Sequence, residues 1–262
     1  YKLGDIPAGL HADGASQGYN AFSLLQTGKD RYGQSLPILF RSFGSYQPPI
    51  YTYLTIIPVA LFGNSIFSAR FISALAGSLL AILTYFFALH LFNKNKDKFV
   101  LASIAALTVT VAPWSILFSR LVVEANLALL LFVLSVSLFI YSLKKIQFLP
   151  IASLILGIST HAYYSERLIA VIFLPLFILL FKDNLLGKGR IFSFRNKKWI
   201  ILAILLFLIT QIPHFIILKS GAFTRRFDQV SYIGNQNKNE SKILNIGKTT
   251  INNYLIYYSP KN

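Results

Sequence analysis

The leading part of the chain carries one aspartate in a polar, glycine-rich stretch, where its carboxylate could take part in chemistry. The stretch reads PAGLHADGASQGYNA over residues 7–21 and contains Asp13. A positioned carboxylate can act as a general base that removes the proton of an attacking hydroxyl. Aspartate is also a common helix N-cap, because its side chain accepts otherwise unpaired backbone N–H groups. From the residue alone, a cap or turn role is favoured over catalysis.

A second polar cluster, His161 to Arg167, separates two short apolar segments. If both segments cross a membrane core of about 30 Å, Glu166 and Arg167 lie near the head-group level. Charges at that depth are costly and usually face a protein-lined cavity, which predicts a recess in the outer leaflet. Taken alone, His161 fits a buried interior histidine, and Tyr163 and Tyr164 fit aromatic residues of the membrane interface.

The composition of the 262-residue chain is that of a membrane protein. Hydrophobic residues make up 55% and charged residues 13%, and the mean hydropathy is +0.58. Soluble domains carry about 25% charged residues. Apolar runs near the ~20 residues that span a bilayer recur along the chain. We therefore predict an all-α, polytopic transmembrane bundle over residues 71–218, with six spans at Phe71–Phe92, Phe99–Phe118, Ala125–Leu143, Phe148–Tyr163, Tyr164–Phe181 and Trp199–Leu218.

Basic residues are distributed unevenly between these spans. They gather in the first, third and fifth connections, residues 93–98, 144–147 and 182–198, whereas Arg120 and Arg167 stand alone in the second and fourth. The positive-inside rule makes the lysine-rich connections cytoplasmic. Residues 1–70 and 219–262 then lie on the outer face of a cytoplasmic (inner) membrane, and a site there faces the periplasm or the cell exterior. The net charge of +16 reflects this orientation and contacts with anionic membrane lipids rather than nucleic acid.

The apolar segment Ile50–Phe62 is too short to be an ordinary span. It has 13 residues, which give about 20 Å of helix against a core of about 30 Å. It follows two prolines and carries tyrosines and threonines that suit the interface. We interpret it as a juxtamembrane helix on the outer surface. If it spans instead, Asp13 moves to the lysine-rich side.

Several short motifs, in their order and spacing, resemble the dolichyl-phosphate-mannose-protein mannosyltransferase and aminoarabinose-transferase family of the glycosyltransferase-C superfamily. The first is an acidic residue early in the outer loop, here Asp13-Gly14. The others read Thr27-Gly28, Tyr46-Gln47-Pro48-Pro49, Phe62-Gly63, Ser68-Ala69-Arg70, Ala112-Pro113-Trp114, Ser119-Arg120, His161-Ala162-Tyr163-Tyr164, Asn253-Tyr254-Leu255 and Tyr258-Ser259-Pro260. The resemblance implies a glycosyltransferase-C bundle and a chain that lacks the family's first span and later helices.

The resemblance also implies an inverting transfer of a sugar from a polyprenyl-phosphate donor to a hydroxyl on a protein, lipid or glycan. Asp13 would be the general base. The departing lipid phosphate favours guanidinium partners, and the outer-face candidates are Arg41, Arg70, Arg120 and Arg167. The expected cavity-lining residues are Glu124, His161, Tyr163, Tyr164 and Glu166.

Some of these residues also have structural interpretations. Arg70 stands at a helix start, where it could form a structural pair or an interface anchor. Arg120 and Glu124 are four residues apart and could form an i,i+4 ion pair.

Two departures from the family pattern leave alternatives open. Gly14 stands where the family usually has a glutamate, which argues against a paired-carboxylate metal site, so no cofactor is assigned and a divalent metal stays an open alternative. Pro48 stands where some members have a lysine. A polytopic transporter or lipid flippase would also hold charges at membrane depth, and a non-catalytic membrane subunit would tolerate the loss of the acidic pair.

Overall fold

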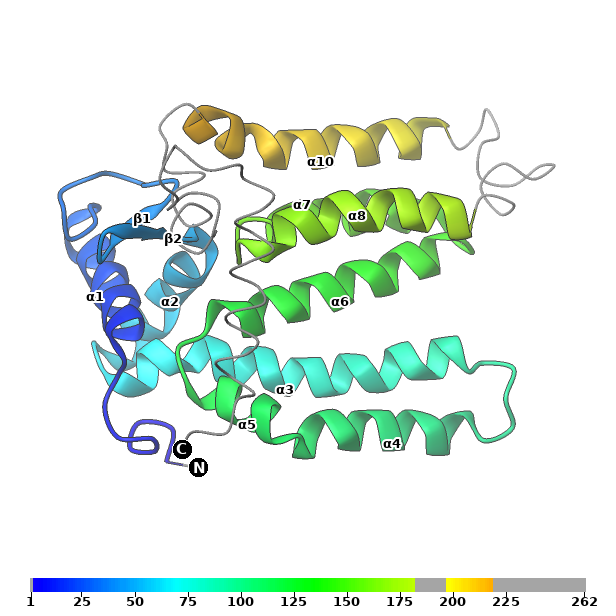
Figure 1. The fold of residues 1–262 in the computed structure, drawn as a ribbon, viewed down its shortest axis with the longest axis horizontal. Helices are drawn as coiled ribbons and strands as arrows, with labels where there is room; N and C mark the ends of the chain where they lie inside the picture. The colour runs from blue at the N-terminus through cyan, green and yellow to red at the C-terminus, as the bar shows by residue number, and fades with distance from the viewer. Residues whose placement is uncertain (1, 182–196, 219–262) are drawn as a thin grey trace, which may run out of the picture.

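The computed structural model describes residues 2–181 and 197–218, and it shows a bundle of helices capped at one end. In Figure 1 most of the helices run side by side along one direction. The bundle helices are α3 (Ile66–Leu91), α4 (Lys98–Val111), α5 (Pro113–Arg120), α6 (Glu124–Ser142), α7 (Leu149–Ser159), α8 (Ser165–Leu180) and α10 (Lys197–Ile217). A 3₁₀ turn, Ile146–Phe148, precedes α7.

The cap consists of α1 (Ala12–Thr27), α2 (Pro49–Phe62) and a hairpin of β1 (Phe40–Ser42) and β2 (Ser45–Gln47). We call the end of the bundle where these elements lie the capped end. The connection between α7 and α8 lies at this end, whereas the α3–α4 and α6–α7 connections, which carry lysines, lie at the opposite end (Figure 1). This arrangement places the capping elements away from the lysines of both connections.

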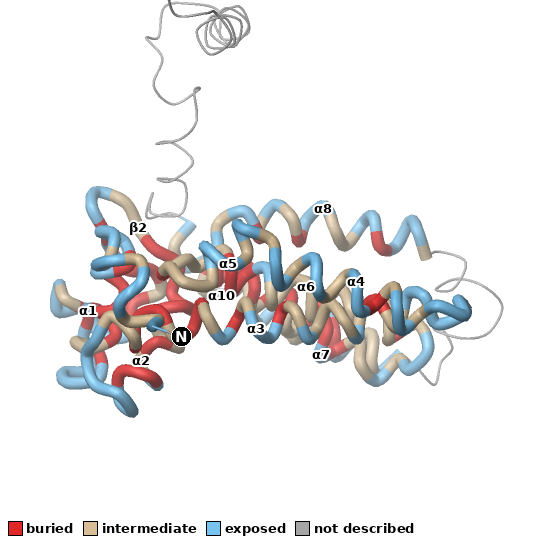
Figure 2. The backbone as a smooth tube through the Cα atoms, turned by 90° about the horizontal axis from the view of Figure 1, so that it is seen from below, coloured by how far each residue is buried: buried red, intermediate tan, exposed pale blue. Residues whose placement is uncertain are grey.

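Three of the described helices, α3, α6 and α10, are long and apolar enough to cross a membrane. Exposed apolar side chains continue along the other bundle helices, for example Leu168, Val171 and Leu179 on α8, and Figure 2 shows long exposed stretches on α4 and α8. Apolar surface of this extent is typical of a lipid-facing protein. The predicted all-helical membrane bundle is thereby confirmed, while the number of six spans stays a prediction.

The predicted span Phe99–Phe118 is wrong as a single helix. The chain bends by 55° between α4 and α5, and Ala112 between them is extended, with ψ 126°. Pro113 causes the break, because a proline disfavours helical geometry in the preceding residue and has no N–H to donate. Neither α4 nor α5 is long enough to span a membrane by itself, but the two together are long and apolar enough to do so. The bend places α5 near the capped end of the bundle (Figure 1).

Helix α3 begins five residues earlier than predicted. Ser65 caps it by accepting a hydrogen bond from the N–H of Ser68, so the helix includes Arg70. Tyr51 of α2 donates its hydroxyl to the Ala69 carbonyl at 2.9 Å. Burial raises the pKa of the Tyr51 phenol well above its ordinary value, which keeps the group a neutral donor. This buried contact joins the cap to the bundle.

The structure also contains the small hairpin, which no sequence pattern predicted. Arg41 pairs with Tyr46, and Ser42 pairs with Ser45. The two residues of the turn, Phe43 and Gly44, have φ values of 42° and 77°. Two consecutive positive φ angles are the geometry of a tight two-residue hairpin turn, which matches the natural twist of the strands. The segment Pro49–Phe62, in turn, is helical as expected and lies within the cap (Figure 1).

Two glycines allow close contacts between helices of the bundle. A Cβ atom on Gly77 of α3 would lie 1.9 Å from the Ser119 hydroxyl oxygen of α5, and one on Gly157 of α7 would lie 1.9 Å from the Thr210 hydroxyl oxygen of α10. Small residues at such crossings let helix backbones approach closely, which replaces the missing hydrophobic drive inside a membrane. The outer loop predicted at residues 219–262 lies outside the described residues.

Candidate active site

Asp13 lies in the first turn of α1, with its side chain directed toward the hairpin. The N-cap position belongs to His11, and no side chain caps this helix. Gln47 of β2 donates from Nε2 to the Asp13 carboxylate at 3.1 Å and to the Asp13 carbonyl at 3.3 Å. Asp13 is therefore not the N-cap of α1, although its residue type suggests that role. Its carboxylate is held by a neighbouring amide and is otherwise exposed.

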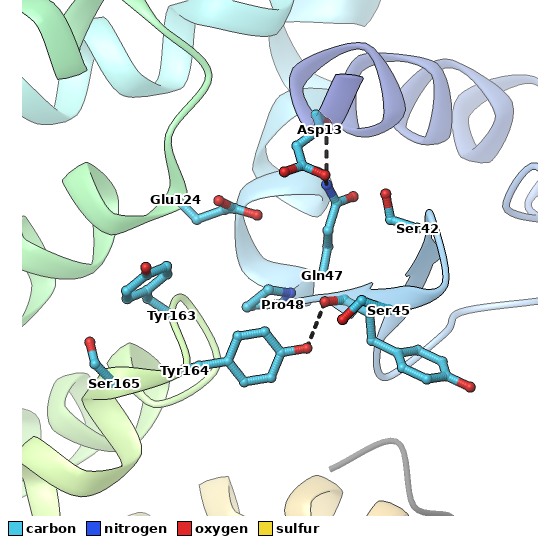
Figure 3. A pocket seen from close by; sticks show the side chains of 10 residues that line it. Asp13, Ser42, Ser45, Gln47, Pro48, Glu124, Tyr163, Tyr164 and Ser165 are labelled. Atoms are coloured by element: carbon cyan, nitrogen blue, oxygen red, sulfur yellow. Dashed lines mark hydrogen bonds between the residues drawn. The ribbon is translucent and has the colours of Figure 1, made fainter. Parts of the chain in front are cut away.

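A cavity of about 310 Å³ opens beside Asp13. Its walls come from α1, the hairpin, the start of α6 and the connection into α8, and they are formed by Asp13, Ser42, Ser45, Tyr46, Gln47, Pro48, Glu124, Tyr163, Tyr164 and Ser165. Figure 3 shows the carboxylates of Asp13 and Glu124 turned toward the same space, with the Gln47 side chain next to Asp13. Two carboxylates, several hydroxyls and aromatic rings thus surround a space of sugar size.

Hydrogen bonds within the cap fix the walls of this cavity. Gln47 is buried, and its Oε1 accepts from the Ser16 hydroxyl at 3.2 Å while its amide nitrogen donates to Asp13. Gln17 of α1 donates from Nε2 to the Glu124 carboxylate. Both carboxylates are thereby oriented by amides, one from β2 and one from α1. No sequence pattern distinguishes Ser16, Gln17 or Gln47 as site residues, because their importance depends on contacts between distant segments.

A further bond attaches the connection between α7 and α8 to the hairpin. The Tyr164 hydroxyl donates to the Tyr46 carbonyl at 2.7 Å, and the dashed line in Figure 3 marks this contact. Tyr163 and Ser165, which are exposed, line the cavity on either side of Tyr164 in the sequence. Of the five expected cavity-lining residues, the structure places Glu124, Tyr163 and Tyr164 in the wall.

The other two, His161 and Glu166, lie behind the wall. His161 stacks on His214 of α10, with ring centroids 3.8 Å apart, and its Nε2 lies 2.6 Å from the Thr210 carbonyl. Glu166 is 5% exposed, and its Oε2 has no hydrogen-bond partner among the described residues. His161 therefore takes part in the α7–α10 contact, as the interior interpretation expects.

The glycine after Asp13 has a steric cause in the structure. Gly14 is buried, and a Cβ atom there would lie 2.9 Å from Cβ of Val122 in the connection between α5 and α6. Helix α1 thus packs its backbone directly against this connection. Two residues later the same connection delivers Glu124 to the cavity. The second carboxylate of the site comes from a distant segment, and the close contact that positions it requires a small residue at Gly14.

We expect Gly14→Glu to destabilise the protein rather than to improve the site. The new side chain would overlap Val122 and force α1 away from the α5–α6 connection, and overpacking of this kind typically costs about 1–3 kcal/mol. Thermal unfolding of the purified protein measures the change. Ala15→Glu, at an exposed position of the same helix turn, is the matched control and should leave the midpoint nearly unchanged. An equal effect of both substitutions would contradict the steric explanation.

Two of the predicted phosphate-binding arginines hold the amino-terminal segment. Arg70 has no exposed surface, and its guanidinium donates to the carbonyls of Leu3 at 2.9 Å, Pro7 at 2.8 Å and Gly9. Arg120 donates from Nη2 to the carbonyls of Lys2 at 3.1 Å and Ile6 at 2.9 Å. Neither lines the cavity. The segment that they hold leads directly into α1 and therefore into Asp13.

Arg120 and Glu124 do not share a helix. Helix α5 ends at Arg120, Leu121 is extended with ψ 165°, and α6 begins at Glu124. The i,i+4 spacing therefore does not place the two residues on one helix face, because the chain changes direction between them. Glu124 is instead directed into the cavity.

The remaining two arginines lie next to residues of the cavity wall. The guanidinium carbon of Arg167 lies 4.7 Å from the centre of the Tyr164 ring. Arg41 is opposite Tyr46 in the hairpin and lies 5.3 Å from the centre of the Tyr32 ring. Among the described residues, no three histidine, cysteine, aspartate or glutamate side chains come together in a way that could hold a metal ion.

Comparison with known proteins assigns the chain to a family. The family model described as dolichyl-phosphate-mannose-protein mannosyltransferase matches residues 46–217, from the second strand of the hairpin to the end of α10. Neither the curated proteins nor the solved structures gave a match. The matched region contributes Tyr46, Gln47, Glu124, Tyr163 and Tyr164 to the cavity, while Asp13 precedes it. The chain belongs to the dolichyl-phosphate-mannose-protein mannosyltransferase family of membrane glycosyltransferases.

Proposed function

We propose that the protein transfers a sugar from a polyprenyl-phosphate donor to a hydroxyl acceptor, with inversion at the anomeric carbon. The observation that carries this proposal is the cavity shared by Asp13 and Glu124, which also presents serine and tyrosine hydroxyls. An alcohol is a weak nucleophile, and a carboxylate held by an amide donor is suited to take its proton. A polar cavity of this size at the end of an apolar bundle matches a sugar that is delivered on a lipid.

In the proposed step, Asp13 accepts the proton of the acceptor hydroxyl as its oxygen bonds to the anomeric carbon. The bond between that carbon and the phosphate oxygen breaks, and the electron pair leaves with the polyprenyl phosphate. Because attack and departure take place on opposite faces, the configuration inverts. Glu124 accepts hydrogen bonds from the sugar hydroxyls and keeps the transferred group in the cavity. Orientation of the reacting groups at such a site contributes several kcal/mol to catalysis.

Arg167 is the arginine that we assign to the departing phosphate. Its guanidinium stacks on Tyr164, a residue of the cavity wall, and guanidinium groups stabilise the charge that develops on a leaving phosphate. Arg70 and Arg120 instead donate to carbonyls of residues 2–9. We propose that these two position α1 and reach the donor only indirectly.

We further propose that the capped end faces the periplasm or the cell exterior. Support comes from Lys94, Lys96, Lys98, Lys144 and Lys145, which belong to the α3–α4 and α6–α7 regions at the opposite end of the bundle. Lysine-rich connections stay on the cytoplasmic side. A polyprenyl-phosphate sugar on the outer leaflet would then reach the cavity laterally from the membrane.

Purified full-length protein in lipid nanodiscs, supplied with a radiolabelled polyprenyl-phosphate sugar and candidate acceptors, tests the function. We expect free polyprenyl phosphate to be released in proportion to the sugar that becomes attached to an acceptor. A lipid flippase would move the labelled donor between leaflets of liposomes without cleaving it. Intact donor after full incubation with each acceptor class would reject the transferase.

A further inference from the structure

A second polar surface adjoins the cavity on the hairpin and the turn that follows α1. It consists of Arg31, Tyr32, Arg41 and Phe43, and we call it the Arg31–Arg41 patch. The Arg31 guanidinium carbon lies 4.9 Å from the centre of the Tyr32 ring and 5.4 Å from that of Phe43. Arg41 lies 5.3 Å from the same Tyr32 ring. Arg31 also donates from Nη2 to the Arg41 carbonyl at 3.2 Å, which joins the two halves of the patch.

The patch presents positive charge that its own surroundings do not neutralise. No carboxylate in the described ranges 2–181 and 197–218 forms an ion pair with Arg31 or Arg41. The nearest acid in the sequence, Asp30, is 4% exposed, and its Oδ1 accepts from the N–H groups of Tyr32 and Gln34, each at 2.9 Å. Asp30 therefore closes the turn from inside, while the guanidinium of Arg41 faces solvent.

The aromatic members of the patch are also exposed. Tyr32 is 54% and Phe43 65% exposed. Stacking on these rings holds the guanidinium planes in place, so less side-chain entropy is lost when the N–H groups bind a ligand. A planar guanidinium matches the two oxygens of a carboxylate or phosphate. Two such groups around an exposed ring suit a ligand that carries an anion on an otherwise polar, ring-containing framework.

The hairpin connects this patch to the cavity. Arg41 lies between Phe40 and Ser42 on β1 and is paired with Tyr46 on β2, and Ser42, Ser45 and Tyr46 line the cavity. Successive strand residues face opposite sides of a hairpin, so Arg41, which is exposed between the buried Phe40 and Ser42, projects on the side opposite the Ser42 side chain. A ligand that places a hydroxyl near Asp13 and an anionic group on the patch must therefore extend around the hairpin, as a chain of sugar units does. The segment between α1 and β1 lies beyond the end of the bundle (Figure 1), away from the apolar helices.

We propose that the Arg31–Arg41 patch binds the phosphate or carboxylate of an anionic acceptor saccharide. This inference rests on the proposed function, because it names the acceptor of the same site. It assigns Arg41, for which the family resemblance predicts a contact with the donor phosphate, to the acceptor. A position beyond the bundle favours a saccharide over a membrane head group as the source of the anion.

Equilibrium binding to the full-length protein in zwitterionic nanodiscs tests the inference without turnover. The probes are trigalacturonate and its fully methyl-esterified, neutral form, with mannose 6-phosphate and mannose as a second pair. We expect the anionic member of at least one pair to bind about tenfold or more tightly than its neutral counterpart. The preference should decrease as salt is raised, because screening weakens exposed charge contacts.

Substitutions in the patch test whether its arginines cause the preference for the anionic probes. Arg31→Gln/Arg41→Gln should reduce it at least about tenfold, and Arg41→Lys should keep part of it, because lysine retains the charge without the planar donor pair. Lys94→Gln/Lys96→Gln, at exposed positions of the opposite end of the bundle, also removes two positive charges and should have no effect. A preference that survives in the double arginine variant, or equal binding of both members of both pairs, overturns the inference. Since Arg31 also contacts the Arg41 carbonyl, Arg41→Gln alone provides a variant with an intact turn.

Two further measurements distinguish a saccharide site from a lipid head-group site, and the failure of this inference from the failure of the proposed function. If the arginine variants alter only binding to nanodiscs that contain phosphatidylglycerol, the anion is a lipid head group and the inference is overturned. Asp13→Asn should bind the anionic probes normally. In the unsubstituted protein, normal binding of the anionic probes together with intact donor in the transfer assay would reject the transferase and keep the patch as a saccharide site. Sugar transfer without any anion preference would reject the patch alone.

Discussion

Asp13→Asn is expected to lower the rate of sugar transfer by roughly 10²–10⁴-fold while the protein remains folded, since general-base catalysis contributes about that factor. The asparagine side chain keeps an oxygen that can accept the hydrogen bond now made by Gln47 Nε2 at 3.1 Å. It has no basic oxygen for the acceptor proton. The substitution therefore removes the proposed chemistry and keeps the local geometry. Initial rates with a labelled polyprenyl-phosphate sugar, at saturating acceptor, measure the effect on kcat.

Asp5→Asn is the matched control for this experiment. Asp5 is exposed, lies in the same leading segment and does not line the cavity. We expect it to leave the rate within about twofold of the unsubstituted protein, in line with the small effects of most surface substitutions. A fully active Asp13→Asn protein would remove Asp13 from the mechanism and leave Glu124 as the remaining carboxylate of the cavity.

Arg70→Met is expected to lower the free energy of unfolding by about 3 kcal/mol, at about 1 kcal/mol for each hydrogen bond lost. Three carbonyls, those of Leu3, Pro7 and Gly9, would lose the donor that Arg70 supplies. Methionine fills part of the space of the buried side chain but donates no hydrogen bond. Thermal unfolding reports the loss of stability, and limited proteolysis within residues 2–10 reports release of the segment. Arg41→Met, at an exposed position, should change neither.

Replacing Arg70 with lysine distinguishes a structural role of this residue from a role in binding the donor phosphate. A residue that holds the leading segment should, when replaced by lysine, lower stability and kcat together, because α1 and Asp13 lose their support. A residue that binds the donor phosphate should instead raise KM for the donor at unchanged stability. A higher donor KM with a normal unfolding midpoint in Arg70→Lys would restore the phosphate-binding interpretation.

Helix boundaries show where sequence patterns were informative and where they were not. The predicted start of the first span at Phe71 was five residues late, because Ser65 caps a helix whose first turn carries mixed polar and apolar residues. The predicted helix at residues 50–62 was correct within one residue. The break at Pro113 was missed because the apolar run continues through it, and hydropathy does not respond to backbone geometry. The hairpin was missed because its strands have only three residues each.

The candidate site shows a similar division. The sequence predicts Asp13, Glu124, Tyr163 and Tyr164 as site residues, and the structure brings them around one cavity. Their charge and their predicted side of the membrane also indicate Arg70 and Arg120, yet the structure directs both to carbonyls of residues 2–9. A carbonyl acceptor leaves no trace in the amino-acid sequence, because every residue has one. Gln47 was quoted only as part of a motif, although it is the residue that holds Asp13.

The amino-acid sequence is sufficient to identify this chain as a helical membrane protein, because the transfer of an apolar segment of about 20 residues into a bilayer depends on that segment alone. It also shows that the lysines gather in alternate connections, from which the orientation in the membrane is predicted. The proximity of Glu124 to Asp13 follows instead from the packing of the folded chain, in which Gln17 of α1 donates to Glu124 across 107 residues of sequence. The same holds for Gly14, whose small size matters only because Val122 lies against it. Contacts of this kind depend on how helices pack, and packing is a property of the whole fold.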